Sequence, residues 1–181
     1  MRQHGYAAVI NFDAAAEKRL KDLWETLEQA GVESSLLPMG ARPHLSLAVF
    51  EEIDEKRLCA ELKRFAETFT DLTVNLHSVG AFPGEHGVVY LTPGVTPELL
   101  ALHAGFHTVL DRMGIPSVRE YRPGDWVPHC TVAMDLPLDQ VSIAVDVTRS
   151  SEVFGPARLC SLALVAFLPL RELCVHPLCE R

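Results

Sequence analysis

The sequence has an excess of acidic residues and lacks long apolar runs, and each of these features removes a class of function. Lys and Arg together number 16 against 24 Asp and Glu, which gives a formal net charge of −8 at pH 7. A protein that follows long nucleic acid neutralises many phosphates with Lys and Arg, so no extended nucleic-acid surface is expected. Neither an apolar run of membrane-spanning length nor the basic-then-apolar pattern of a secretory signal occurs. We therefore expect no membrane partner and a cytoplasmic location.

Cysteine and glycine do not occur in the patterns that would indicate a disulfide framework or a phosphate-binding loop. The five cysteines are an odd number without a C-x-x-C pair, so we expect reduced, mostly buried thiols in a reducing compartment. The sequence has neither a G-x-G-x-x-G motif nor a P-loop, which disfavours nucleotide binding of those kinds. Because no Gly- or Ser-rich linker divides the chain, we expect residues 1–181 to form a single domain of two lobes around a shared cleft.

Hydrophobic periodicity and capping residues predict the same order of elements twice. Asp13 and Thr96 are the expected N-caps of two amphipathic helices, which end before Gly31 and Gly114. Each of these helices is followed by a strand, a further helix and another strand. The expected strands are 6–12, 41–50, 72–82, 87–92, 126–134 and 157–170, and the expected helices are 14–30, 54–69, 97–113 and 138–149. We interpret this pattern as a duplicated β-α-β-α-β unit.

Two of the expected strands carry the same pair of polar residues, a histidine followed two positions later by a hydroxyl. The first pair lies in HLSL at 44–47 and the second in HCTV at 129–132, and the histidines are 85 positions apart. Because side chains alternate along a strand, the histidine and hydroxyl of each motif should share one face, opposite apolar residues. By this alternation Leu45, Leu47 and Val49 oppose His44, Ser46 and Ala48, and Cys130, Val132 and Met134 oppose His129, Thr131 and Ala133. Matching parity at matching places of a repeat indicates function rather than two isolated surface histidines.

Two histidines across a cleft are suited to acid–base chemistry on a phosphoester. An imidazole titrates near pH 6.5, so one ring can take a proton from an attacking oxygen while the other protonates the leaving oxygen. Hydroxyls two positions further along can hold the non-bridging phosphoryl oxygens, and this arrangement requires no metal or other cofactor. We therefore expect the two motif strands to lie side by side, with both imidazoles facing one cavity.

The two motifs, at their places in the repeat, resemble the 2H phosphoesterase superfamily, which includes 2′-5′ RNA ligase-like proteins and 2′,3′-cyclic nucleotide phosphodiesterases. The mark of that superfamily is a pair of His-x-Thr/Ser motifs, each followed by an apolar residue, and the resemblance covers almost the whole chain. It implies a bilobal α+β fold in which two antiparallel-rich sheets line a central groove, with the helices outside. It also implies metal-independent cleavage or ligation of 2′-linked or cyclic ribose phosphates, and we expect hydrolysis rather than ligation. By position, His44 and His129 become the acid–base pair, and Ser46 and Thr131 become the phosphate-binding hydroxyls.

Further candidates for binding a small nucleotide or short oligonucleotide lie close to the two motifs. Arg42 shares its expected face with His44 and is the best candidate for a phosphate contact. The segment before the second histidine, REYRPGDWVPH, also offers side chains that bind phosphate or stack on bases. These are Arg119, Tyr121, Arg122 and Trp126. The alternative is that this segment is a surface loop, which its tryptophan anchors to the core.

Two alternatives to a metal-independent phosphodiesterase stay open. The first is a binding module that keeps the groove but does not turn substrate over. The second is a metal-dependent hydrolase that uses His103 and His107, which share a helix face at positions i and i+4. Against the second, Ala104 stands where a metalloprotease H-E-x-x-H motif has its glutamate, so these histidines are expected to be solvent-facing or packed.

Overall fold

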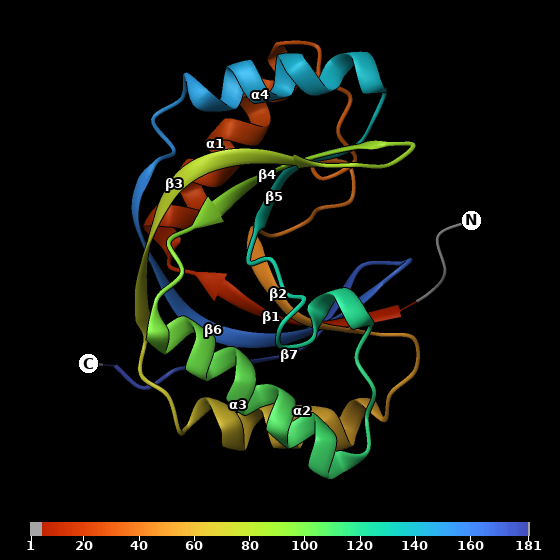
Figure 1. The fold of residues 1–181 in the computed structure, drawn as a ribbon, viewed down its shortest axis with the longest axis vertical. Helices are drawn as coiled ribbons and strands as arrows, with labels where there is room; N and C mark the ends of the chain where they lie inside the picture. Colours follow the sequence, from red (N-terminus) through yellow and green to blue (C-terminus); the bar gives the residue numbers. More distant parts are fainter. Residues whose placement is uncertain (1–4, 181) are drawn as a thin grey trace.

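The computed structural model of the protein describes residues 5–180, in which one strongly curved sheet lies between two pairs of helices (Figure 1). The first repeat unit contains β1 (Gly5–Phe12), α1 (Ala14–Gln29), β2 (His44–Phe50), α2 (Glu55–Ala66) and β3 (Leu72–Phe82). The second contains β4 (Gly87–Pro93), α3 (Pro97–Met113), β5 (Cys130–Leu136), α4 (Val141–Arg149) and β6 (Gly155–Phe167). Two 3₁₀ turns, η1 (Arg119–Tyr121) and η2 (Leu138–Gln140), precede β5 and α4, and β7 (Arg171–Pro177) ends the order. The predicted duplication is confirmed, and β7 is an addition that the sequence pattern did not indicate.

The predicted caps fix the starts of the longer helices. The Asp13 carboxylate accepts the Ala16 N–H at 2.9 Å, and the Thr96 hydroxyl oxygen accepts the Leu99 N–H at 3.2 Å. Both bonds satisfy amides of a first helical turn that have no partner within the helix. At its other end, α3 stops at Gly114, whose φ of 70° lies in the left-handed region that favours glycine.

A single antiparallel sheet contains all the described strands, in the order β2-β1-β6-β3-β4-β5, with β7 paired to β6. The strand that joins the two halves is β3. Its residues 72–76 pair with β6, and its residues 76–82 pair with β4. The α+β class is therefore confirmed, and the two sheets implied by the resemblance are continuous through β3. The two motif strands, β2 and β5, take the two ends of the strand order.

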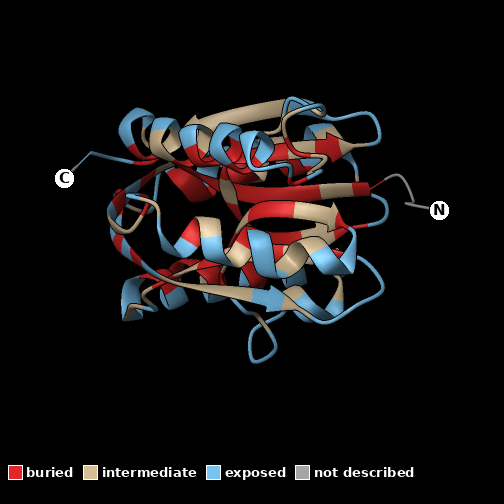
Figure 2. Cartoon of the chain, turned by 90° about the horizontal axis from the view of Figure 1, so that it is seen from above, coloured by how far each residue is buried: buried red, intermediate tan, exposed pale blue. Residues whose placement is uncertain are grey.

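The helices pack in pairs on the outer side of the curved sheet. Helices α1 and α4 contact each other. Helix α1 also contacts β1, β5 and β6, and α4 contacts β3 and β4, while α2 contacts β6 and β7 and α3 contacts β2. Buried residues follow the strands and the helix faces turned toward them, and exposed residues follow the outer helix faces (Figure 2). A second, smaller apolar cluster of Ala7, Val9 and Ala163 lies on the other face of β1 and β6. That inner face also carries His44.

Both motif strands contain a β-bulge at the apolar residue that follows the hydroxyl. On β2, Ser46 pairs with Val9 and Ala48 pairs with Ala8, which leaves Leu47 as the extra residue. On β5, the residues on either side of Val132 pair with consecutive residues of β4 in the same way. A bulge inserts one residue and reverses the alternation of the side chains beyond it. The repeat thus reproduces an irregularity as well as the regular elements.

The bulges make the predicted alternation wrong beyond the hydroxyls. Ala48 and Ala133 were expected on the histidine face, but both are fully buried in the main core. Val49 and Met134 were expected in the core and are instead half-buried. Val49 packs against the small inner cluster, and Met134 lines a pocket with His129. The parity of the histidine and hydroxyl themselves is not affected, because both precede the bulge.

The expectation of five reduced thiols is wrong for two of the cysteines. Cys59 on α2 and Cys174 on β7 form a disulfide across 115 positions of sequence. Cysteine usage therefore no longer supports a reducing compartment. Cys130 is free and buried, and burial raises the pKa of its thiol to about 12, so it stays protonated. Within residues 5–180, no helix is both long enough and apolar enough to cross a membrane.

Candidate active site

Both motif histidines are held by the same local hydrogen bond. His44 Nδ1 lies 2.6 Å from the carbonyl oxygen of Arg42, and His129 Nδ1 lies 2.7 Å from that of Val127. A carbonyl oxygen only accepts, so Nδ1 must carry the proton in each ring. The tautomer is thereby fixed, and Nε2 is the nitrogen left for chemistry in both rings. Each bond reaches back two residues, which makes it a property of the motif rather than of one half of the chain.

The curvature of the sheet brings the two motifs together although β2 and β5 are not paired strands. Some Cα atoms of β2 and β5 lie within 8 Å of one another. The backbone of His44 also lies close enough to the Cys130 thiol to lower its pKa, and Cys130 directly follows the second histidine. The two motif strands therefore lie close together, as expected, but they do so because the two edges of the sheet meet. They are not hydrogen-bonded to each other as neighbouring strands.

Burial lowers the pKa of both motif histidines. For His44, desolvation has the largest effect, and the positive charge of His129 lowers its pKa further. For His129, desolvation again dominates, and the bond to the Val127 carbonyl partly offsets it. Burial and the nearby positive charge both favour the neutral imidazole.

His129 lies in a pocket of about 480 Å³ with a largely apolar lining. Phe82 and Tyr90 stack with ring centroids 4.2 Å apart, and both rings contact the imidazole of His129 edge-on. Thr131 and the predicted Tyr121 belong to the same lining. From the sequence, Phe82 was interpreted as a core residue that could form a base platform if it faced the groove, and Tyr90 was not singled out.

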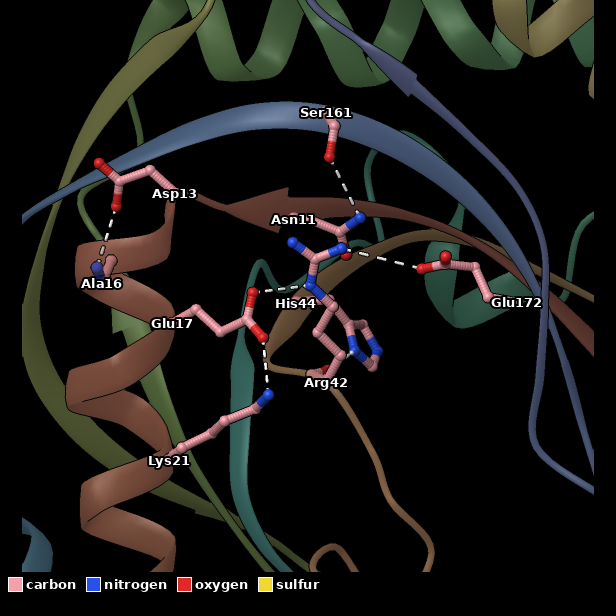
Figure 3. Close-up of polar contacts among 9 residues, drawn as sticks. All are labelled: Asn11, Asp13, Ala16, Glu17, Lys21, Arg42, His44, Ser161 and Glu172. Atoms are coloured by element: carbon pink, nitrogen blue, oxygen red, sulfur yellow. Dashed lines mark hydrogen bonds and ion pairs between the residues drawn. The ribbon is translucent and has the colours of Figure 1, made fainter.

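His44 lines a second, more polar hollow of about 380 Å³, together with Asn11 and Arg42. The single cavity expected for the two imidazoles is thus divided into two hollows. Asn11 stands opposite His44 in the β1–β2 register, and its side-chain amide donates to the Ser161 hydroxyl at 3.3 Å (Figure 3). Both partners are buried, Asn11 being 2% exposed and Ser161 8% exposed. The signal that could have found Asn11 is a lone amide in the otherwise apolar strand YAAVINF.

Arg42 lies beside His44 as expected, but two carboxylates share its charge. Its Nε donates to Glu17 at 2.7 Å, and its Nη1 lies 3.8 Å from Glu172 (Figure 3). Although burial opposes it, hydrogen bonds from Lys21 and Arg42 hold the pKa of Glu17 below its usual range. The Arg42 side chain remains 38% exposed next to the imidazole. It is therefore placed to meet an anion, but the region around it is close to neutral.

The structure places the four candidates of segment 119–129 in different surroundings. Tyr121 reaches the His129 pocket, with ring centroids 6.5 Å apart. Arg119 is exposed and pairs with Asp125 at 3.2 Å. Arg122 donates to the Ser117 carbonyl at 2.8 Å and lines a different hollow, against α3.

Trp126 makes the contacts of an anchor. Its Nε1–H donates to the Ser46 carbonyl at 2.9 Å, and its ring is stacked on His103 with centroids 3.8 Å apart. One face of the indole is therefore already covered by protein.

The two helix histidines are buried, and their Nε2 atoms meet backbone oxygens. His103 Nε2 lies 3.1 Å from the Leu47 carbonyl oxygen, and His107 Nε2 lies 3.0 Å from the same atom. The possibility that they are solvent-facing is wrong, and the packed alternative is correct. Across the part of the chain that the structure describes, no three His, Cys, Asp or Glu side chains group as metal ligands.

Comparison with known proteins agrees with this geometry. The model of the 2′-5′ RNA ligase superfamily matches residues 13–168. Protein TT0787 of Thermus thermophilus superposes with a TM-score of 0.67 at 18% identity, over 98% of this chain and 99% of that one. Escherichia coli LigT in complex with 3′-AMP gives a TM-score of 0.61 at 17% identity, over 98% and 96% of the two chains. Kluyveromyces marxianus Usb1 with uridine monophosphate gives 0.51 at 11% identity, over 94% and 97%.

No curated protein gives a significant match to the chain. The solved structures are too distant in sequence to show more than the fold, whereas the family model covers most of the chain. The paired motifs, their mutual geometry and this match together identify the chain as a member of the 2′-5′ RNA ligase superfamily, and thus as a 2H phosphoesterase family protein.

Proposed function

We propose that the protein is a metal-independent phosphodiesterase that hydrolyses 2′,3′-cyclic or 2′-5′-linked ribose phosphates. The observation that carries this proposal is the repeated arrangement of the two imidazoles. Each ring is locked by its Nδ1–H on a carbonyl, which leaves two Nε2 atoms in neighbouring motifs. Two such nitrogens supply one general base and one general acid, which is what hydrolysis of a phosphodiester needs.

For a 2′,3′-cyclic phosphate, the reaction balances with these groups and water. The Nε2 of one histidine takes a proton from water, and the water oxygen attacks phosphorus in line with a ring P–O bond. That bond breaks, and the Nε2–H of the other histidine protonates the departing ribose oxygen. The product is a phosphomonoester, and the reverse reaction would exchange the two roles.

Two hydroxyls are the proposed ligands of the phosphoryl oxygens. Ser46 and Thr131 follow their histidines by two positions, precede the bulges and are half-buried. Hydrogen bonds from these hydroxyls would stabilise negative charge as it develops on the non-bridging oxygens. Arg42 is the candidate for an added positive charge, shared with Glu17.

Solved relatives support a small nucleotide as the ligand. The LigT structures hold 3′-AMP and NADP+, and a Usb1 structure holds uridine monophosphate. Those ligands belong to the relatives, and they favour a nucleotide-sized ligand over a long RNA for this acidic chain. Tyr121, with Phe82 and Tyr90 nearby, is the candidate for contact with a base.

The test is turnover of a substrate panel with and without a chelator. The panel contains 2′,3′-cyclic nucleotides, ADP-ribose 1″,2″-cyclic phosphate and 2′-5′-linked dinucleotides. Product formation that survives EDTA, and that is lost in His129→Ala but kept in the exposed control His77→Ala, supports the proposal. Tight binding without product would instead show a binding module, and activity lost on chelation would show a metal-dependent hydrolase.

A further inference from the structure

The open edge of β2 is bound by the segment that leads into the second motif. The Val118 N–H donates to the Val49 carbonyl at 2.8 Å, and the Ser117 hydroxyl lies 3.3 Å from both the nitrogen and the oxygen of Val49. An edge strand presents unpaired amides and carbonyls, which need partners when they are covered. Ser117 and Val118 thus occupy this open edge, at the start of the segment that leads to His129.

The open edge of β5 is bound in the same way by the segment that leads into the first motif. The Ser35 N–H donates to the Met134 carbonyl at 3.3 Å, and the Met134 N–H donates to the Ser34 hydroxyl at 3.2 Å. Met134 is 85 positions after Val49, the same spacing as between the motif histidines. Each motif strand is therefore hydrogen-bonded, at its open edge, to the chain segment that leads into the other motif strand.

The helices that cover the two edges do not share this symmetry, because they carry different side chains at equivalent positions. The N-caps of α1 and α3 are 83 positions apart, and by the same spacing His103 and His107 of α3 correspond to Leu20 and Trp24 of α1. Leu20 and Trp24 are buried, and the Trp24 indole nitrogen has no hydrogen-bond partner among the described residues. Packing a helix against a motif strand therefore does not in itself require polar side chains at these positions.

The polar rings on α3 bind the backbone at the bulge of the first motif. His103 and His107, 2% and 6% exposed, both direct Nε2 at the Leu47 carbonyl. The indole of Trp126 binds the preceding carbonyl, that of Ser46. Successive carbonyls of a regular strand point to opposite edges, but here two in a row are bonded by side chains from outside the sheet.

His103 also binds the segment that leads into the second motif. His103 Nε2 lies 2.9 Å from the Tyr121 carbonyl oxygen as well, and its ring is parallel to that of Trp126, with 6° between the planes. Trp126 immediately precedes Val127, whose carbonyl holds His129. The cluster of His103, His107 and Trp126 therefore contacts the backbone of the first motif and of the segment that leads into the second.

We propose that His103, His107 and Trp126 are positioning residues that set the two imidazoles and the Ser46 hydroxyl relative to one another. They act through the Ser46 and Leu47 carbonyls on one side and through the 121–127 segment on the other. This inference rests on the proposed function for its effect on rate, but the placement of the rings that it asserts does not depend on turnover. A displacement of about 1 Å in an active site can cost on the order of 100-fold in rate.

The test replaces the donors and keeps the packing. Trp126→Phe removes the indole N–H and retains an aromatic ring, His103→Leu copies the residue of the other half, and His103→Gln retains an Nε2–H donor. We expect kcat to fall about 10-fold to 100-fold in the first two, with KM and Tm little changed, and to recover in the third. Thr108→Ala, on the exposed face of α3, is the control. Rates within twofold of wild type in folded Trp126→Phe and His103→Leu would overturn the proposal.

A second measurement separates this inference from the proposed function. Long-range ¹H–¹⁵N spectra report the tautomers and pKa values of His44 and His129 without any substrate. The proposal requires both sets of imidazole resonances to change in Trp126→Phe and to stay constant in Thr108→Ala. Unchanged resonances would contradict the positioning role, whereas inactivity of the wild-type protein would contradict only the function. If His103→Leu does not fold, Trp126→Phe carries both measurements.

Discussion

Removing either motif imidazole should abolish most of the activity, and removing both should cost little more. The proposed step needs one Nε2 to accept a proton and the other to donate one. In each ring Nδ1 is committed to a backbone carbonyl, so it cannot take over when the other ring is lost. We therefore expect His44 and His129 to act as one unit.

The expected magnitudes distinguish this unit from two independent groups. A general acid or base contributes about 10²-fold to 10⁴-fold, which corresponds to about 3–5 kcal/mol of barrier. Independent groups would multiply, so the double variant would lose roughly 10⁴-fold to 10⁸-fold. Groups that act together leave the double variant near about 10²-fold to 10⁴-fold, so their coupling energy equals the effect of a single substitution.

The assay is steady-state hydrolysis of the best substrate by His44→Ala, His129→Ala and the double variant. Asparagine variants provide a matched pair, because an Asn amide can still donate to the carbonyl that holds each ring while lacking Nε2. The alanine and asparagine variants should be equally slow, and thermal unfolding should verify that all are folded. Full activity in folded His129→Ala, or losses that multiply in the double variant, would refute the two-histidine mechanism.

Four further outcomes are expected. Ser46→Ala and Thr131→Ala should each lose less rate than the histidine variants and should raise KM as well; unchanged kinetics in both would remove the hydroxyls from the site. Because burial lowers the pKa of both motif histidines, the bell-shaped pH profile of kcat/KM should centre below pH 6.5. The profile of kcat should centre at a higher pH, because a bound phosphate anion favours the protonated ring; two profiles centred at the same pH would contradict this. Burial, and then the charge of a neighbouring histidine, lower the pKa of His103 to about 4. As the pH falls, the unfolded chain therefore takes up the His103 proton before the folded protein does. Urea unfolding should show that the free energy of unfolding decreases by up to about 3 kcal/mol between pH 6.5 and 4, and this decrease should be absent in His103→Gln. Replacing Cys59 and Cys174 by Ser should lower the free energy of unfolding by up to about 5 kcal/mol, from closure of a loop of 115 positions, and an unchanged denaturation midpoint would contradict the pairing.

The elements of the fold could be predicted because their signals are local. Asp13, Thr96 and Gly114 mark helix ends through contacts within one turn, and all three act as expected. The strands 72–82 and 87–92 were likewise predicted to within a residue of their bounds. Duplication then followed from the order of the elements, without any knowledge of their pairing.

Features that depend on pairing between distant segments could not be predicted. The bulges at Leu47 and Val132 appear only when β1 and β4 supply a register, and nothing in HLSL or HCTV distinguishes a bulge from a regular strand. The same holds for β3, which changes its partner at Leu76. The disulfide needed α2 to meet β7, a strand that the sequence pattern did not indicate.

The candidate site shows the same division. The motif histidines could be found because each is followed two positions later by a hydroxyl, and because both stand at equivalent places of the repeat. Asn11 reaches the site only because β1 pairs with β2, and Glu17 only because α1 lies next to Arg42; their sequence context is that of an ordinary strand and helix. From the sequence, Trp126 could either stack on a base or anchor its loop to the core. Its contacts with Ser46 and His103, which only the structure shows, favour the role of an anchor.

The repeat provides two chemically equivalent imidazoles, but their surroundings differ. His129 is bordered by the rings of Phe82 and Tyr90, whereas His44 is bordered by Asn11 and the charges around Arg42. A flat apolar group gains more from the first environment, and a hydroxyl-rich or charged group gains more from the second. In the proposed reaction, the histidine beside the departing oxygen is the acid, so the way a substrate lies across these two hollows decides which imidazole is acid and which is base. We therefore expect the asymmetry of the neighbours, and not of the motifs, to set the direction of proton transfer.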